Sequence, residues 1–179
     1  MNADVILHFW FEEIEPKQWF IKDIQLDGIL RERFADVHRA ATLGELASWR
    51  VTAEGRLAEI IILDQFSRNL YRDLPEAFAY DTAALILAQE AITLGADHDV
   101  PVAYRNFFYM PFMHSESALI HQVALDLFAQ PGAEFNYEFE LKHKAIIDRF
   151  GRYPHRNVTL GRSSTQEEIE FLQQPNSSF

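Results

Sequence analysis

The chain has 179 residues, of which 48% are hydrophobic and 13% aromatic, and it carries a formal net charge of −11 and no cysteine. This size and apolar content fit one domain with a full hydrophobic core and exclude a disordered chain. The lack of cysteine excludes disulfides and thiolate chemistry, and the acidic charge disfavours nucleic acid and anionic membranes as partners. Since no apolar run approaches the roughly 20 residues of a membrane helix, we expect a cytoplasmic protein.

Apolar residues recur at helical spacing along almost the whole chain, and no run alternates as a half-buried strand would. We therefore expect an all-α protein, an antiparallel array of about nine helices joined by short links. It would form one helical domain over 1–179, with 174–179 as a frayed tail. The expected helices cover residues 4–14, 23–37, 42–49, 52–71, 73–95, 101–111, 115–131 and 136–150, with a last short one after Thr165.

The expected helix over 52–71 changes along its length from apolar on all sides to polar on one side. Ile61 and Ile62 make it apolar all round for one turn, and the same side then becomes polar. This pattern is typical both of a helix that emerges into solvent and of one that lines a polar pocket, so the ligand-binding and ion-pair interpretations both stay open. The polar residues named as ligand candidates are Asp64, Arg68, Asn69 and Arg72, and the spacing of Asp64 and Arg68 predicts an ion pair.

A second candidate is the stretch around His114 and Glu116. If a helix starts at Ser115, both residues lie at its N-terminus, where backbone N–H groups favour an anion. Either side chain is suited to acid or base catalysis, and capping or packing is the competing interpretation. As a metal site the pattern is weak because residues two apart do not face each other, so no metal is expected.

His143 lies in line with Ile146, Ile147 and Phe150 on the helix over 136–150. A lone histidine on an apolar face is more often a core residue than a functional one. This helix leads directly into the next candidate segment, however, so His143 is kept as a ligand-binding candidate.

The most unusual segment is 149–162, which contains four arginines, one histidine and one asparagine but no acidic residue. Its formal charge of +4 contrasts with −11 for the whole chain. Arginine forks match carboxylate and phosphate oxygens, so Arg152, His155, Arg156 and Asn157 are the binding candidates, with His155 also a catalytic one. The alternative is a structural loop whose arginines tie helix ends together.

Three motifs together resemble a known family. They are Leu63-Asp64-Gln65-Phe66-x-Arg68-Asn69, Met110-Pro111-Phe112-Met113-His114-Ser115-Glu116, and the arginine-rich segment Arg149-Phe150-Gly151-Arg152-Tyr153-Pro154-His155-Arg156-Asn157-x-x-Leu160-Gly161-Arg162. In this order they are similar to a bacterial domain-of-unknown-function family, number nine-two-four. Ser67 departs from it, since many members are expected to have proline there. The resemblance implies a tetratricopeptide-like α-α superhelix and supplies no activity.

The sequence thus predicts that three distant segments converge on one pocket. Asp64, Arg68, Asn69 and Arg72 would form one wall, His114 and Glu116 a second, and Arg152, His155, Arg156 and Asn157 a third. The expected guest is a small phosphate- or carboxylate-bearing anion, with histidine and glutamate available for acid–base chemistry and no cofactor. Whether the protein is an enzyme stays open. The alternative is a peptide- or protein-binding module in which these residues form a structural ion-pair network.

Overall fold

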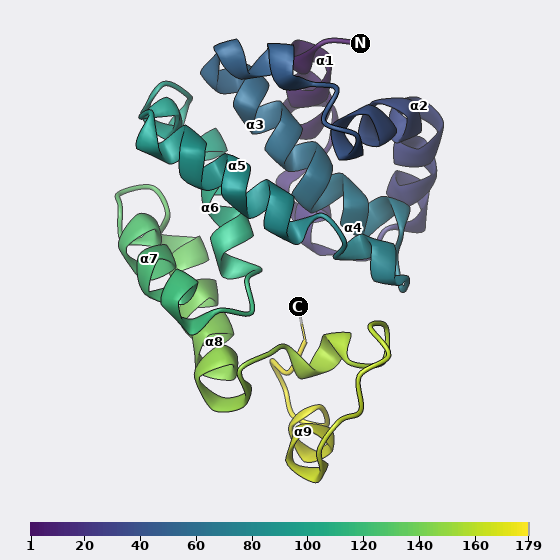
Figure 1. Cartoon of the computed structure of the whole chain (residues 1–179), viewed down its shortest axis with the longest axis vertical. Helices are drawn as coiled ribbons and strands as arrows, with labels where there is room; N and C mark the ends of the chain where they lie inside the picture. Colours follow the sequence, from purple (N-terminus) through teal and green to yellow (C-terminus); the bar gives the residue numbers. More distant parts are fainter. Residues whose placement is uncertain (179) are drawn as a thin grey trace. The chain divides into compact units, whose positions relative to one another are not determined.

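The computed structural model describes residues 1–178, and within that range it contains helices and no strand (Figure 1), which confirms the all-α prediction. The chain divides into two compact units. The first comprises Met1–Arg72 and Glu76–Pro111, and the second comprises Asp73–Pro75 and the described residues from Phe112 onward. A single domain over 1–179 stays a prediction.

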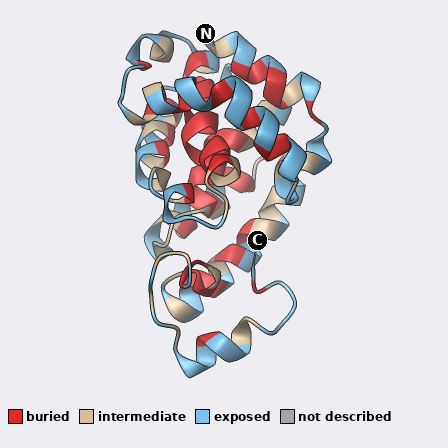
Figure 2. Cartoon of the chain, turned by 90° about the vertical axis from the view of Figure 1, so that its right-hand side faces the viewer, coloured by how far each residue is buried: buried red, intermediate tan, exposed pale blue. Residues whose placement is uncertain are grey.

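The first unit is built around α3. Its helices are α1 (Ala3–His8), α2 (Ile24–Thr42), α3 (Ala53–Ile61), α4 (Ser67–Leu70), α5 (Asp81–Thr93) and α6 (Val102–Met113), the last belonging to this unit as far as Pro111. Helix α3 packs against both α1 and α5. Its residues Leu57, Ile60 and Ile61 are fully buried. Figure 2 colours the buried positions of the chain red. From Leu57 to Ile61 every residue of α3 is buried, as expected of a helix in such a central place.

Aromatic rings fill the rest of this core. Phe9 lies 4.8 Å from Phe34 between ring centroids, and Trp10 lies 5.6 Å from Phe66 and 5.8 Å from Phe107. These side chains come from four separate elements, so their contacts hold the first unit together over long stretches of sequence. Rings at such separations in tilted or edge-on orientations also attract one another directly.

Two turns of π-helix interrupt the α-helical geometry, at Phe9–Glu13 after α1 and at Ile62–Phe66 between α3 and α4. The second turn carries Asp64 and Gln65, and all of its side chains are buried. The helix over this stretch is therefore enclosed on every side, as the run of apolar residues predicted. Turns of this kind occur often at functional positions.

Several helix ends match their predicted signals. Asp23 caps α2 by accepting from the backbone N–H groups of Gln25 and Leu26, and Thr52 caps α3. Thr165 and Glu168 form the expected capping box of α9. These motifs act within one helical turn, which is why sequence alone locates them.

Other ends differ from the prediction. Asn2, not Asp4, caps α1, and the helix expected over 42–49 is absent because Thr42 ends α2 and a 3-10 turn follows at Ala47–Val51. Asp73 adopts a left-handed backbone with φ 65°, so α5 begins only at Asp81. Pro111 does not break α6, which continues to Met113.

The second unit contains α7 (Ala118–Phe128), α8 (Glu134–Phe150) and α9 (Gln166–Phe171), with α7 and α8 packed together. Helix α7 begins three residues later than expected, after Ser117. A small core of Ile146, Ile147 and Tyr153 is covered by Phe150 and Phe171. In the predicted tail, Ser177 is buried and its hydroxyl donates to the Leu172 carbonyl, and Phe179 lies outside the described residues.

Candidate functional site

The arginine-rich segment of the second unit follows α8 as a fixed loop. Gly151 ends α8 with φ 66°, a left-handed conformation that glycine adopts without strain. Pro154–Arg156 then forms one 3-10 turn, and Gly161, also at φ 66°, makes a second turn. Asn157 is fully buried between these turns and donates from Nδ2 to the Ser164 hydroxyl. The loop is therefore defined by local backbone chemistry and by one buried amide.

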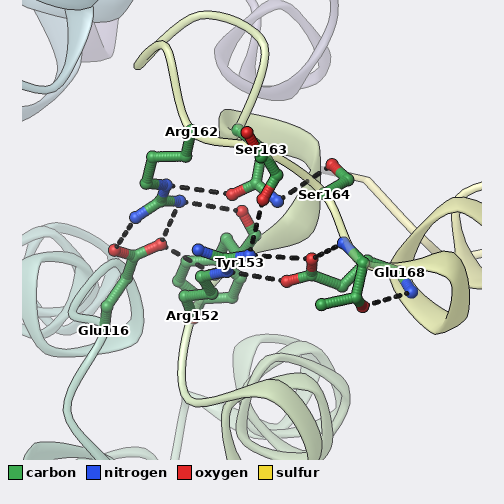
Figure 3. Close-up of polar contacts among 9 residues, drawn as sticks. Glu116, Arg152, Tyr153, Arg162, Ser163, Ser164 and Glu168 are labelled. Atoms are coloured by element: carbon green, nitrogen blue, oxygen red, sulfur yellow. Dashed lines mark hydrogen bonds and ion pairs between the residues drawn. The ribbon is translucent and has the colours of Figure 1, made fainter.

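Arg162 and Glu116 connect this loop to the turn before α7. The guanidinium donates twice to the carboxylate, with Nη1–Oε2 at 2.6 Å and Nη2–Oε1 at 2.9 Å (Figure 3). Glu116 Oε1 also accepts the backbone N–H of Tyr153 at 2.7 Å, and Arg162 Nε donates to Asn157 Oδ1. Glu116, a residue of the second predicted wall, therefore contacts the arginine-rich segment through Arg162 and Tyr153, and a shared pocket stays a prediction.

Two further arginines of the segment bind carboxylates of α9. Arg152 donates from Nε and Nη2 to the two oxygens of Glu168 at 2.7 and 2.8 Å (Figure 3). Arg149 pairs with Glu167 in a more exposed position. Three of the four arginines therefore pair with carboxylates of their own unit.

The ion pairs fix the protonation of Glu168, which is buried, and of Glu116, which is partly buried. Arg152 holds the pKa of Glu168 at about 2, with the Thr165 backbone N–H acting in the same direction. Burial by itself would raise the pKa of Glu116, but hydrogen bonds from Arg162 and the Tyr153 backbone lower it below its usual value. Both groups are ionised near neutral pH, so Glu116 is a hydrogen-bond acceptor there and a poor proton donor.

Tyr153 is the centre of a cluster of nitrogen-bearing side chains. Its ring is fully buried, and the guanidinium carbon of Arg156 lies 4.7 Å from the ring centroid. Ring centroids of His155, His143 and His121 lie 5.5, 5.7 and 6.3 Å from that of Tyr153. One guanidinium and three imidazoles therefore surround a single buried ring.

His143 is the neutral member of this cluster. Its Nδ1 faces the Phe139 carbonyl at 2.8 Å, one helical turn back along α8, so Nδ1 carries the proton. Burial lowers the pKa of His143 to about 3, and electrostatic interactions with His114, His121 and Arg156 act in the same direction. His114 is thus close enough to act electrostatically on the same cluster.

In the first unit, the predicted wall contains two ion-pair groups. Arg68 donates to both oxygens of Asp81 at 2.9 and 3.0 Å, and its Nη1 also lies 3.2 Å from Asp64 Oδ1, which confirms the predicted pair four residues apart. Asp64 is buried and accepts from the Gln65 amide as well. This arrangement places one arginine between two carboxylates.

The other group joins α4 to α2. Arg72 donates from Nε and Nη2 to Asp27 at 2.6 and 2.7 Å, and Asn69 donates to the same carboxylate at 2.9 Å. Asp27 is buried, so these three bonds offset the cost of removing its charge from water. Convergence of this wall with the residues of the second unit stays a prediction.

Several residues that organise the second unit were not among the candidates. Arg162 and Glu168 were not site candidates, because their carboxylate or guanidinium partners lie in other segments of the chain. Glu140 could have been identified from the sequence. Its spacing to His143 and Ile147 places a carboxylate on the apolar face of α8. Among residues 1–178, no group of three or more histidine, cysteine, aspartate or glutamate side chains is arranged to hold a metal ion.

Comparison with known proteins identifies the family. Residues 6–176 match the sequence profile described as bacterial protein of unknown function, DUF924. The chain belongs to this family. A solved structure, that of a protein of unknown function (ATU0120) from Agrobacterium tumefaciens, is 41% identical, is matched over 96% of both chains and superposes with a TM-score of 0.90. No functionally curated protein matches the chain.

Membership of DUF924 confirms the resemblance drawn from the three motifs and names no activity. Among residues 1–178, no helix is both long and apolar enough to cross a bilayer.

Proposed function

We propose that the second unit binds a small anion, phosphate- or carboxylate-bearing, at Arg156 together with His114 and His155. The observation that carries the proposal is the gathering of Arg156 and three imidazoles around the Tyr153 ring. Charges interact more strongly in a buried setting than in water. An anion brought to this cluster gains from a guanidinium and from any imidazole that is protonated.

Arg156 lies against the ring at the centre of the cluster. The other arginines of the segment, Arg149, Arg152 and Arg162, pair with Glu167, Glu168 and Glu116. Arg156 has a different setting, because it is buried and stacks on an aromatic ring. The positive charge of Arg156 also contributes to the lowered pKa values of Glu116 and His143. Its potential therefore extends across the cluster.

Imidazoles also give the site a capacity for acid–base chemistry. Histidine exchanges protons near neutral pH more readily than any other side chain, so His114 and His155 are our candidates for moving a proton on a bound substrate. Glu116 is better suited to positioning, because its lowered pKa and its bonds to Arg162 and Tyr153 keep it ionised. Asp64, Arg68, Asn69 and Arg72 belong to the first unit and are not part of this proposal.

The test is binding of inorganic phosphate, pyrophosphate and citrate to the full chain, measured by calorimetry and by thermal unfolding. A bound anion stabilises the folded state by mass action. We expect Arg156→Gln to weaken the binding by about tenfold or more. Arg149→Gln is the matched control, because it removes the same charge from an exposed pair, and it should change Kd by less than about twofold.

Equal losses in both variants, or no binding of any of the three anions, would refute the proposal. The competing function is a tetratricopeptide-like interaction module in which the motif residues form a structural network. The two-pronged pairs Arg152–Glu168 and Arg162–Glu116 favour that role for those four residues. An Arg156→Gln variant that unfolds more easily yet binds anions as tightly as the wild type would support the module instead.

A further inference from the structure

His121 of α7 and Glu140 of α8 form a buried pair that the proposed function does not yet use. Both side chains are completely buried, and His121 Nδ1 lies 2.6 Å from Glu140 Oε1. The other imidazole nitrogen, Nε2, lies 2.8 Å from the carbonyl oxygen of Ser115. One histidine thus connects a buried carboxylate to the backbone of the turn that carries His114 and Glu116.

The chemistry of the two contacts determines where protons reside. A carbonyl oxygen only accepts, so Nε2 of His121 must carry a hydrogen. Nδ1 then either donates to an ionised Glu140 or accepts from a protonated one, and in both arrangements one proton lies between the two groups and the pair has no net charge. Burial raises the pKa of Glu140, although the bond to His121 and the charge of Lys144 oppose this shift.

The turn before α7 is held at a second point by Tyr153. The Tyr153 hydroxyl donates to the Met113 carbonyl at 2.5 Å and lies 3.2 Å from His121 Nε2. Buried side chains therefore hold the carbonyls on both sides of His114, those of Met113 and Ser115. The backbone of Tyr153 in turn donates to the carboxylate of Glu116. His114 and Glu116 are placed by this network and not by the N-terminus of α7.

We propose that His121 and Glu140 are a positioning pair for the anion site: sharing one proton, they hold the Ser115 carbonyl and so fix the directions of His114 and Glu116. The expected effect on anion binding rests on the proposed function. The positioning of the turn rests only on the contacts of His121. A hydrophobic pair of similar volume would fill the same space but would leave the turn free to rotate its carbonyl.

Two variants of Glu140 separate positioning from packing. In Glu140→Gln the amide N–H can donate to Nδ1 as a protonated carboxyl does, so Nε2–H stays on the Ser115 carbonyl. Glu140→Met keeps the volume but leaves Nδ1 with no partner from this position, and the tautomer is no longer set. We expect Glu140→Gln to bind phosphate within about threefold of wild type, and Glu140→Met to bind about tenfold more weakly.

Nitrogen NMR of the imidazoles measures which ring nitrogen carries a hydrogen, a property that a change in packing alone would not alter. In the wild-type chain, Nε2 of His121 should carry a hydrogen, because it faces the Ser115 carbonyl. The ring signals of His114 should move in Glu140→Met and return in Glu140→Gln. A His121 whose Nε2 carries no hydrogen in the wild type, or an unmoved His114 signal in Glu140→Met, would overturn the inference.

The two proposals fail in different ways. If wild-type chain binds no phosphate, the anion site is refuted, while the His114 and His121 signals still decide the positioning pair. If phosphate binds and Glu140→Met binds it as tightly as wild type, the pair does not position the site. Should Glu140→Met not fold, the protonation of His121 Nε2 in the wild type and in Glu140→Gln decides whether the pair holds the Ser115 carbonyl.

Discussion

Arg162 and Glu116 are 46 positions apart, and they meet in a two-pronged ion pair with Nη1–Oε2 at 2.6 Å. The same carboxylate accepts the backbone N–H of Tyr153. Through these bonds, the end of the arginine-rich loop is attached to the turn that precedes α7. This pair therefore joins two segments of the second unit that are far apart in the sequence.

Replacing Arg162 with alanine should lower the free energy of unfolding by about 2–4 kcal/mol, because Glu116 is left partly buried without its charge partner. Urea denaturation at neutral pH measures the change. The loop should also loosen, since Arg162 donates to Asn157 and to the Tyr153 carbonyl.

Arg149→Ala is the control for this prediction. The Arg149–Glu167 pair is 46% and 62% exposed at its two side chains, so its loss should change stability by less than about 0.5 kcal/mol. Similar decreases in the free energy of unfolding in the two variants would show that the Arg162–Glu116 pair stabilises the fold no more than the exposed pair does.

Two buried histidines should make the protein less stable as the pH falls below 6.5. Burial lowers the pKa of His38 to about 4 and that of His143 to about 3. The unfolded chain then takes up protons that the folded chain does not, so stability is complete above the unfolded pKa and is lost as the pH falls. The expected loss is about 2 kcal/mol for each histidine between pH 6.5 and pH 5.

Conservative variants test this assignment. His38→Gln retains a donor toward the Ser67 hydroxyl, and His143→Asn retains one toward the Phe139 carbonyl. The double variant should show a flatter dependence of unfolding free energy on pH over this range. Glu140, whose raised pKa acts with the opposite sign, is present in every variant and cancels in the comparison. An unchanged slope in the double variant would contradict the prediction.

Two glycines in helices should respond in opposite directions to alanine. A Cβ at Gly55 would lie 1.9 Å from the Trp49 carbonyl oxygen, whereas a Cβ at Gly28 meets nothing within 4 Å. Gly55→Ala should therefore destabilise the chain by about 2 kcal/mol or more. Gly28→Ala, in the exposed face of α2, should stabilise it by about 0.5–1 kcal/mol. Thermal unfolding of the two variants checks the signs, and a neutral Gly55→Ala would show that α3 shifts away from Trp49 at little cost.

Capping motifs read from the sequence located some, but not all, of the helix starts for which they were used. Asp23, Thr52 and the Thr165–Glu168 box cap helices as expected. Thr42 had the same spacing to Glu45 but lies at the end of α2, where its hydroxyl bonds back to the Arg39 carbonyl. A capping motif thus supports a helix start in many cases but does not create one when the preceding helix already uses the residue.

In the candidate site too, the sequence identified the residues but not their partners. The sequence identified the arginine-rich segment and its histidines, and it left open whether the arginines bind a guest or tie helices together. Arg152 and Arg162 prove to bind Glu168 and Glu116, while Arg156 lies over Tyr153. Nothing in the segment itself distinguishes these arginines, because their partners lie elsewhere in the chain.

The sequence by itself determined the all-α architecture, many of the helix ends and the membership of DUF924. Each of these depends on residues within a few turns of one another or on a pattern read along the chain. Only the tertiary structure decided which carboxylate meets which arginine, and that His121 connects Glu140 to the Ser115 carbonyl. Helical hydrogen bonds span four residues and are encoded locally, whereas buried ion pairs depend on how distant helices pack.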